Sequence, residues 1–229
     1  MAINSTTLDP AAKYVDNEET ALTRARYQRI SPIYDRIEWL MERRFRSWRA
    51  KLWQLVYGPR VLEVGVGTGK NMEFWPLNCK VTAIDLTPGM LDIARQHAKS
   101  LNRQQDDLFL ADVQHLELPS GIFHTVVATF VFCSVPDPIQ GLREIGRVVR
   151  PDGQILLLEH VRIDRPVIGT LMDMIAPLIV RLNGANINRR TIENVRTAGL
   201  HIDRVENLDD MGMFKLIFAR PKAGFVYEE

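Results

Sequence analysis

The sequence predicts an α/β fold: a doubly wound sheet of seven strands, mostly parallel with one antiparallel edge strand, together with N-terminal helices and a lid insertion. Two observations support this prediction. Short apolar runs, typical of strands buried on both faces, alternate with amphipathic helical patterns along the chain. Three of these runs end in glycines or acidic residues, at the strand ends where doubly wound sheets bind their ligands.

Composition excludes several classes of protein. The chain has 229 residues, of which 46% are hydrophobic and 25% charged, as expected of a globular domain with a sizeable core. Its formal charge of +1 provides no field that would attract nucleic acid, so we expect no such partner. Cys79 and Cys133 are too few for a disulfide framework or a zinc site, and we expect no metal. Without a signal-peptide pattern or 18 consecutive apolar residues, we expect a cytoplasmic protein.

The chain divides into three predicted parts: a flexible arm over residues 1–17, a helical cap over 18–58 and a core over 59–229. The arm is polar and lacks periodicity. In the cap, Ser31 and Pro32 are typical of a helix start. Apolar residues then recur at three- and four-residue steps, and they are Ile33, Ile37, Leu40, Met41, Phe45, Trp48, Leu52 and Leu55.

Basic residues crowd the other faces of this expected helix. Between Arg36 and Arg60, seven basic residues stand against two acids. One interpretation is a helix packed on its own domain with a solvated basic face. The other is contact with an anionic membrane through Arg43, Arg44 and Arg46, which would place the protein peripherally on the inner membrane face.

A glycine-rich turn follows the first expected strand, in the sequence Arg60-Val-Leu-Glu-Val-Gly-Val-Gly-Thr-Gly-Lys-Asn71. Without Cβ atoms, Gly65, Gly67 and Gly69 permit a tight turn and let a ligand lie against bare backbone. The same glycines would also suit a simple tight connection. Glu63 ends the strand, where we expect its carboxylate to face a cofactor. The spacing is Gly-x-Gly-x-Gly, unlike the usual dinucleotide fingerprint.

Acidic residues end the next two expected strands. Residues 80–85 form a second buried-strand pattern that ends in an acid, at about the interval after a glycine turn where doubly wound folds bind a ribose diol. Residues 107–111 form a third, followed by Asp112-Val-Gln114, an acid and an amide suited to reading an adenine edge. Three strand ends with carboxylates predict a nucleoside pocket.

These strand ends resemble the first three motifs of class I S-adenosylmethionine-dependent methyltransferases, a superfamily with a Rossmann-like fold, over residues 60–220. The resemblance implies S-adenosylmethionine as cofactor and S-adenosylhomocysteine as product. It also implies that the glycines pass under the methionine part, that Asp85 binds the ribose hydroxyls, and that Asp112 and Val113 flank the adenine. The cofactor-binding residues predicted in this way are Glu63, Gly65, Gly67, Gly69, Asp85, Leu86, Asp112, Val113 and Thr129.

The remaining core elements follow in order. We expect a short helix after the glycines, a second helix capped by Thr87, and a central fourth strand at residues 123–132. A fifth strand at 154–158 and two closing strands, 201–207 and 213–219, complete the sheet.

The insertion at residues 165–188 is rich in apolar residues, but Asp173 and Pro177 within it exclude a membrane span. We expect it to form a lid over the carboxyl ends of the strands, which would suit a lipophilic acceptor. The alternative is a helix that completes the core.

The segment Tyr27-Gln-Arg-Ile-Ser-Pro-Ile-Tyr34-Asp35 resembles the one that precedes the cofactor fold in bacterial phosphatidylethanolamine N-methyltransferases and quinone C-methyltransferases. In those enzymes the segment forms part of the acceptor pocket, which implies that Tyr27 and Tyr34 are walls of a substrate site. The alternative is that the two tyrosines pack against the domain with their hydroxyls in solvent. The quinone enzymes continue Tyr-Asp-x-x-Asn-Asp, whereas this chain has Glu38-Trp39.

Parts of the C-terminal half resemble membrane-associated alkyl-thiol S-methyltransferases. These parts are Val131-Phe-Cys-Ser-Val135, Glu159-His160-Val161 and Gly184-Ala-Asn186. Nitrogen, sulfur and carbon acceptors therefore all stay open. The leading hypothesis is methyl transfer to a lipophilic or membrane-delivered acceptor, with the amine of a phospholipid as the preferred one. A non-catalytic cofactor-binding protein and an NAD-dependent oxidoreductase are less favoured.

Two further positions are candidates for the acceptor site. His160, at the end of the fifth strand, is the preferred proton acceptor, with Glu159 and Tyr34 as substitutes. A structural histidine bonded to backbone is the alternative for His160. Arg189, at an expected helix start, would bind a substrate phosphate or simply be solvated.

Overall fold

The structure is a computed structural model that describes residues 18–103, 106–183 and 186–222. The predicted arm at 1–17 and most of the Gly184-Ala-Asn186 motif lie outside the described residues.

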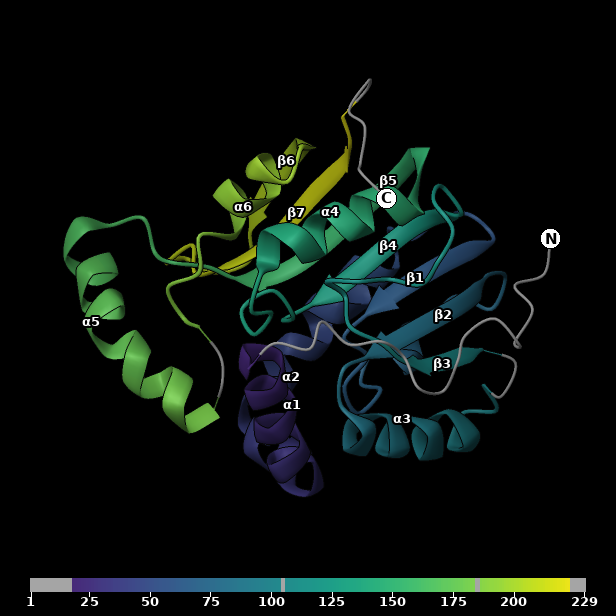
Figure 1. The fold of residues 1–229 in the computed structure, drawn as a ribbon, viewed down its shortest axis with the longest axis horizontal. Coiled ribbons are helices and arrows are strands. Elements are labelled where there is room, and N and C mark those ends of the chain that lie inside the picture. The colour runs from purple at the N-terminus through teal and green to yellow at the C-terminus, as the bar shows by residue number, and fades with distance from the viewer. Residues whose placement is uncertain (1–17, 104–105, 184–185, 223–229) are drawn as a thin grey trace.

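Seven strands form one sheet in the order β3-β2-β1-β4-β5-β7-β6 (Figure 1). They are β1 (Arg60–Val64), β2 (Lys80–Asp85), β3 (Asp107–Leu110), β4 (Phe123–Thr129), β5 (Val149–His160), β6 (Leu200–Asn207) and β7 (Phe214–Pro221). Neighbouring strands are parallel except at β7, which runs antiparallel to both β5 and β6. The predicted fold class is confirmed, with β4 at the centre and the antiparallel strand one place inside the edge formed by β6.

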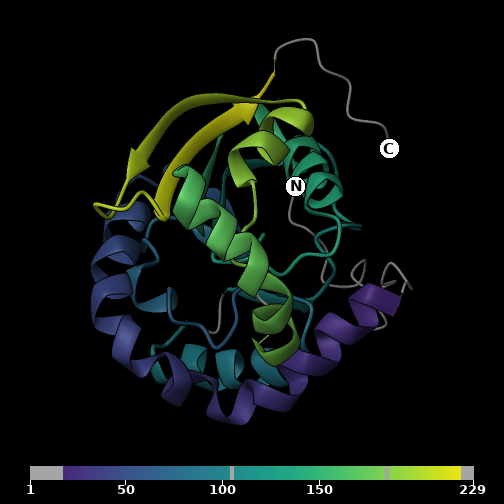
Figure 2. The ribbon, with the colours of Figure 1, turned by 90° about the vertical axis from the view of Figure 1, so that its left-hand side faces the viewer.

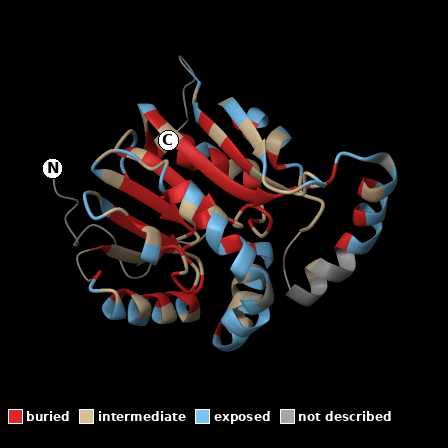
Figure 3. Cartoon of the chain, turned by 180° about the vertical axis from the view of Figure 1, so that it is seen from behind, coloured by how far each residue is buried: buried red, intermediate tan, exposed pale blue. Residues whose placement is uncertain are grey.

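Helices cover both faces of the sheet, so each central strand is buried on two sides (Figures 1 and 3). The helices are α1 (Glu18–Ile30), α2 (Tyr34–Trp53), α3 (Pro88–Ser100), α4 (Pro138–Val148), α5 (Pro166–Asn183) and α6 (Thr191–Thr197). Leu142 of α4 and Val195 of α6 pack on one face. Leu52 of α2 and Leu91 of α3 pack on the other. This burial on both faces explains why the strands are apolar runs in the sequence.

Three helix starts differ from the sequence-based expectation. Ser31 begins a 3-10 turn (Ser31–Ile33), and its hydroxyl donates to the Gln28 carbonyl instead of capping α2. Thr87 precedes α3 without a capping bond, because its backbone N–H donates to Asp85 and its side chain also interacts with that carboxylate. The short helix expected after the glycines is only a 3-10 turn, Met72–Phe74.

The predicted lid forms one helix, α5, which stands apart at the edge of the molecule in Figure 1 and crosses the side facing the viewer in Figure 2. An ion pair of 2.9 Å between Arg162 and Asp173 ties it to the chain that leaves β5. Gly169, Met172 and Ala176 are buried on its inner side. Its outer side exposes Val167, Leu171, Met174 and Ile175. Among the described helices, none is long and apolar enough to cross a membrane.

Candidate active site

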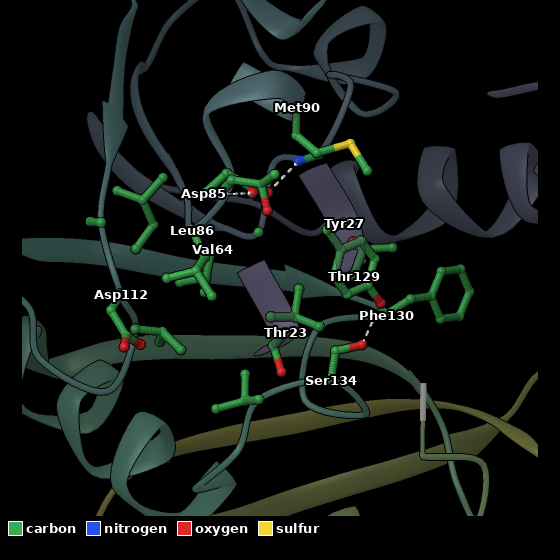
Figure 4. Close-up of a pocket in the computed structure, with 18 of the residues that line it drawn as sticks. Thr23, Tyr27, Val64, Asp85, Leu86, Met90, Asp112, Thr129, Phe130 and Ser134 are labelled. Carbon is green, nitrogen blue, oxygen red and sulfur yellow. Dashed lines mark hydrogen bonds between the residues drawn. The ribbon is translucent and has the colours of Figure 1, made fainter. Parts of the chain in front are cut away.

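A cleft opens at the carboxyl ends of the parallel strands, between the sheet and the N-terminal helices (Figure 4). Its walls come from strand ends, from α1 and α2, and from the loop after β4. The lining residues are Thr23, Tyr27, Tyr34, Val64, Gly65, Gly67, Ile84, Asp85, Leu86, Thr87, Met90, Ala111, Asp112, Val113, Thr129, Phe130, Val131, Ser134, Val135 and Pro136. Most residues predicted to bind a cofactor are thus brought together at one place.

The glycine turn presents open backbone to this cleft. Gly65 and Gly67 have φ angles of +67° and +57°, a backbone conformation that residues with a side chain rarely adopt. A Cβ atom at Gly65 would lie 2.5 Å from Val131, so this glycine is required by packing as well. A Cβ atom at Gly67 would meet nothing within 4 Å, and it would project into the space available to a ligand.

Asp85 ties the glycine turn to the second strand. Its Oδ2 accepts from the Gly67 N–H at 2.9 Å, and its Oδ1 accepts from the Thr87 N–H at 2.8 Å. Burial raises the pKa of Asp85, while these bonds oppose the rise. The Asp85 side chain lines the cleft, where its carboxylate is placed to accept a bond from a ribose hydroxyl.

Asp112 and Val113, which follow β3, line the cleft. The Asp112 carboxylate is buried and accepts from both the backbone and the side-chain amide of Gln114. Gln114 also donates to Thr20 of α1 at 3.1 Å and accepts from the Asp137 N–H at 2.9 Å. The acid is therefore held in place by a network that joins α1, β3 and the start of α4.

Glu63 is not where the sequence analysis expected it. Its side chain is 1% exposed and accepts from Asn71 and Trp75, both at 2.6 Å, beneath the glycine turn. Burial raises its pKa to about 7. Because side chains alternate along a strand, Val64 faces the cleft and Glu63 faces away. Gly69 is likewise buried outside the lining, so these two predicted contacts with a cofactor are corrected.

The two tyrosines of the cap, Tyr27 and Tyr34, both line the cleft. The Tyr27 hydroxyl lies 2.5 Å from the Ser134 hydroxyl, so it joins α1 to the loop after β4. The Tyr27 and Tyr34 ring centroids are 6.4 Å apart, and the Lys70 ammonium lies 5.3 Å from the Tyr34 ring. The role of Ser134 was not predicted, because nothing in the sequence links it to a helix 107 residues away.

A polar clamp that was also missed holds α2 against the glycine turn. Asp35 accepts from the Thr68 hydroxyl at 2.8 Å and pairs with Lys70 at 3.4 Å. Further along the helix, buried Arg49 donates to Asn71 at 3.0 Å. The sequence contains one signal for this clamp: Arg49 lies near the apolar side of an amphipathic helix, and a buried cation needs a partner.

The remaining candidates lie outside the cleft. His160 is 8% exposed, burial lowers its pKa to about 4, and its Nε2 has no partner within the described part of the chain. Arg189 donates to the Val135 carbonyl at 2.9 Å rather than facing the cleft. Buried Glu159 accepts from two backbone amides after β4. Of the predicted catalytic residues, only Tyr34 reaches the cleft.

The described residues contain no cluster of three or more His, Cys, Asp or Glu side chains able to hold a metal ion. They do fit S-adenosylmethionine. The open backbone at Gly67 suits the amino-acid part, and the Asp85 carboxylate in the lining suits a ribose. Apolar side chains at Ile84, Leu86 and Val113 provide flat contact for an adenine.

Comparison with known proteins agrees with this geometry. The methyltransferase domain family Methyltransf_11 matches residues 62–157. A phosphatidylethanolamine N-methyltransferase from Cereibacter sphaeroides is 36% identical over 47% of this chain and 54% of its own length. A thiol S-methyltransferase, TMT1B, from Mus musculus is 36% identical over 44% of this chain and 42% of its own. The chain thus spans about half the length of these two curated relatives.

Two more similarities extend over longer stretches. The ubiquinone/menaquinone biosynthesis C-methyltransferase UbiE of Citrifermentans bemidjiense is 31% identical over 64% of this chain and 66% of its own length. A solved geranyl diphosphate methyltransferase in complex with SAM shares the fold, with a TM-score of 0.64 and 16% identity over 77% of this chain and 85% of that one. Residues 62–157 therefore form a methyltransferase domain, and the fold and the strand-end residues agree with those of class I S-adenosylmethionine-dependent methyltransferases.

Proposed function

We propose that this methyltransferase acts on a lipophilic acceptor delivered from a membrane, and that the preferred acceptor is the amine of a phospholipid. The observation that carries the proposal is the acceptor side of the cleft, where Tyr27 and Tyr34 face it beside Phe130 and Val131. This wall is aromatic and apolar, as a lipophilic substrate requires. The similarity to the phosphatidylethanolamine N-methyltransferase favours nitrogen as the acceptor atom. The relatives that act on thiols and quinones make sulfur and carbon the alternatives.

The chain's own residues would act mainly by positioning. S-adenosylmethionine bound in the cleft supplies an electrophilic methyl group. The turn at Gly67 and the Asp85 carboxylate would orient the donor, and the tyrosine walls would exclude water and align the acceptor in line with the methyl group. A neutral amine already has a free lone pair, so the attack itself needs no base. A phospholipid ammonium would first release its proton to solvent, and the hydroxyl oxygen of Tyr34, whose side chain reaches the cleft, is the candidate to accept a hydrogen bond from the resulting amine. A catalytic role for His160 stays a prediction that its buried position does not favour.

Contact with a membrane forms part of the same proposal, and it would place the protein peripherally on the inner membrane face. Arg43 and Arg44 are exposed on α2, and the Arg44 guanidinium lies 5.1 Å from the Trp48 ring. Arg46 is already paired with Glu73, so we assign it a smaller part. Exposed apolar side chains on α5, on α2 and on the turn before α2 would enter the same interface. They are Ile33, Ile37, Val167, Leu171 and Met174.

An acceptor assay tests the proposed substrate. Purified protein is incubated with methyl-labelled S-adenosylmethionine and one of three acceptors: phosphatidylethanolamine vesicles, a small alkyl thiol or a demethylated quinone. We expect label in the phospholipid. Label in the thiol or the quinone would replace the proposed acceptor by that one. If no acceptor is labelled although the cofactor binds, the proposal is contradicted and the non-catalytic alternative gains support.

Sedimentation with vesicles tests the membrane contact. We expect the protein to co-sediment with anionic vesicles. The sedimented fraction should fall as the salt concentration rises, because salt screens surface charges. Reversing Arg43, Arg44 and Arg46 together should release it. Reversing Arg150, Arg204 and Arg220, which are exposed on the β-strands, is the matched control and should have little effect. Equal losses in both triple variants would contradict a specific membrane face.

A further inference from the structure

The loop after β4 forms one wall of the cleft and begins with an unfavourable backbone conformation. Phe130, Val131, Ser134 and Val135 of this loop line the cleft. Phe130 has a φ of +58°, in the left-handed region of backbone conformation that residues other than glycine and asparagine rarely adopt. Such a conformation persists only where the surroundings hold it. The residues that hold the loop therefore determine the shape of this wall.

A buried acid holds the first half of the loop. Glu159, near the end of β5, is 0% exposed, and its Oε1 accepts from the N–H groups of Val131 at 2.9 Å and Phe132 at 3.0 Å. The Phe130 N–H donates to the carbonyl of Leu158, the preceding residue of β5, at 2.8 Å. Three successive amides of the loop are thus bound by two neighbouring residues of one strand.

A cation holds the second half of the loop. Arg189 donates through Nη2 to the Val135 carbonyl at 2.9 Å and to the Cys133 carbonyl at 3.4 Å. The Asn186 N–H donates to the same Cys133 carbonyl at 2.9 Å. Glu159 therefore accepts hydrogen bonds from amides of the loop, and Arg189 donates hydrogen bonds to its carbonyl oxygens.

The acid and the arginine also interact with each other. Burial raises the pKa of Glu159 to about 7, and the positive charge of Arg189 opposes this rise. The same two charges act in opposite directions on the Cys133 thiol, whose pKa is raised to about 12, chiefly by burial. Neither Glu159 nor Arg189 lines the cleft. Their influence on a substrate must therefore pass through the loop.

We propose that Glu159 and Arg189 are positioning residues. They fix residues 130–135, the acceptor wall of the cleft, by binding the two ends of this loop on the side that faces away from the cleft. This inference rests on the proposed function, because it assumes that an acceptor lies against this wall. It assigns the two residues a role different from proton transfer and from phosphate binding. They should affect acceptor use strongly and cofactor affinity hardly at all, since the glycine turn and Asp85 have other supports.

Cys133 offers a direct test that needs no acceptor. It is 4% exposed and lies within the loop, so its reaction with a thiol reagent reports loosening of the wall. The experiment uses a Cys79→Ser background, which leaves Cys133 as the only thiol. We expect Glu159→Leu and Arg189→Met each to accelerate its modification about tenfold or more, whereas Glu159→Gln, which keeps an accepting oxygen, should be affected much less.

Glu144 provides a matched control. It is also a buried acid that accepts from a backbone amide, that of Leu116 at 2.7 Å, and pairs with an arginine, Arg147. Neither Glu144 nor Leu116 lines the cleft, and the bond between them lies outside residues 130–135. Glu144→Leu should therefore destabilise the fold without exposing Cys133. If Glu144→Leu and Glu159→Leu accelerate the modification equally, or if Glu159→Gln reacts as fast as Glu159→Leu, the positioning role is refuted.

Kinetics complete the test with phosphatidylethanolamine vesicles as the acceptor probe. In Glu159→Leu we expect kcat/KM for the acceptor to fall about tenfold, while calorimetry shows an S-adenosylmethionine Kd within about twofold of the wild type. A parallel fall in cofactor affinity would overturn the assignment to the acceptor wall. If the wild type does not methylate this lipid, the proposed acceptor fails, while the thiol measurement still decides the positioning role.

Discussion

The side of the cleft that we assign to the cofactor and the side that we assign to the acceptor are built in different ways. On the cofactor side, backbone groups and short acids at consecutive strand ends face the cleft, as at Gly67, Asp85 and Asp112. On the acceptor side, long side chains from α1, α2 and the loop after β4 meet across large sequence separations, as Tyr27 meets Ser134. The first side depends on the sheet, and the second depends on separate segments docked onto it.

This difference explains why related chains share a donor and differ in the acceptor. Strand ends keep their places as long as the sheet is intact, so a nucleoside site is a stable feature of the fold. Helices and loops docked by a few polar contacts can change without loss of the sheet. The relatives named above, which act on a lipid amine, a thiol or a quinone, follow this pattern. Variants on the two sides should therefore have separable effects.

The largest effect is expected for Asp85→Ala on the cofactor side. This change removes the acceptor of the Gly67 and Thr87 amides and the group available to a ribose, so the turn and the ligand both lose support. We expect S-adenosylmethionine affinity to fall at least about 100-fold, as for the loss of charge-assisted bonds. Calorimetry measures it, with Asp92→Ala, an exposed acid on α3, as control. Unchanged affinity would refute the ribose assignment.

The second effect concerns the acid beneath the glycine turn. Burial raises the pKa of Glu63 to about 7, above its unfolded value, so the folded state binds a proton more tightly. Its contribution to stability is complete below pH about 4.5 and is lost as pH rises towards 7, by up to about 3 kcal/mol. Urea unfolding at several pH values should show this slope in the wild type.

The variant Glu63→Gln should have lower stability but should lack that part of the slope. Glu159, with a pKa raised to about 7, contributes a slope of the same sign, and His160, with a pKa lowered to about 4, contributes the opposite one. The difference between wild type and variant isolates Glu63. Identical slopes would mean that its carboxyl group titrates normally in the folded protein.

A smaller effect is expected where the two sides meet. Asp35 joins α2 to the glycine turn through Thr68 and Lys70. The Asp35 carboxylate is largely exposed, and such contacts contribute little each. We therefore expect Asp35→Ala to speed S-adenosylmethionine dissociation about threefold in stopped-flow measurements, without loss of thermal stability. A much larger change would show that the cap, rather than the strand ends, retains the donor.

The sequence revealed the two sides to different degrees for the same reason. The strand ends were predictable because each one is local: an apolar run, then a glycine or an acid. Glu63 differs from this local rule because side chains alternate along a strand, so that Val64 lines the cleft and Glu63 lies beneath the glycine turn.

The contacts of the acceptor side were beyond local patterns. Arg189 was expected to bind phosphate or solvent, but its partners are carbonyl oxygens more than 50 residues earlier in the chain. Glu159 likewise binds amides 27 and 28 residues away. Backbone acceptors and donors have no residue-specific signature, so only the folded arrangement identifies them. The two tyrosines were found through the family resemblance of their segment, and not through periodicity.

The smallest effect is expected for Tyr27→Phe on the acceptor side. The change keeps the aromatic wall and removes only the hydroxyl that bonds to Ser134, so α1 loses one contact with the loop after β4. We expect KM for the acceptor to rise about twofold with unchanged S-adenosylmethionine affinity, since one neutral hydrogen bond can contribute as little as about 0.5 kcal/mol. Tyr57→Phe is the control, because its hydroxyl bonds to the Asp152 carbonyl far from the cleft. If Tyr27→Phe instead weakened cofactor binding and left KM unchanged, the division of the cleft into two independently variable sides would be wrong.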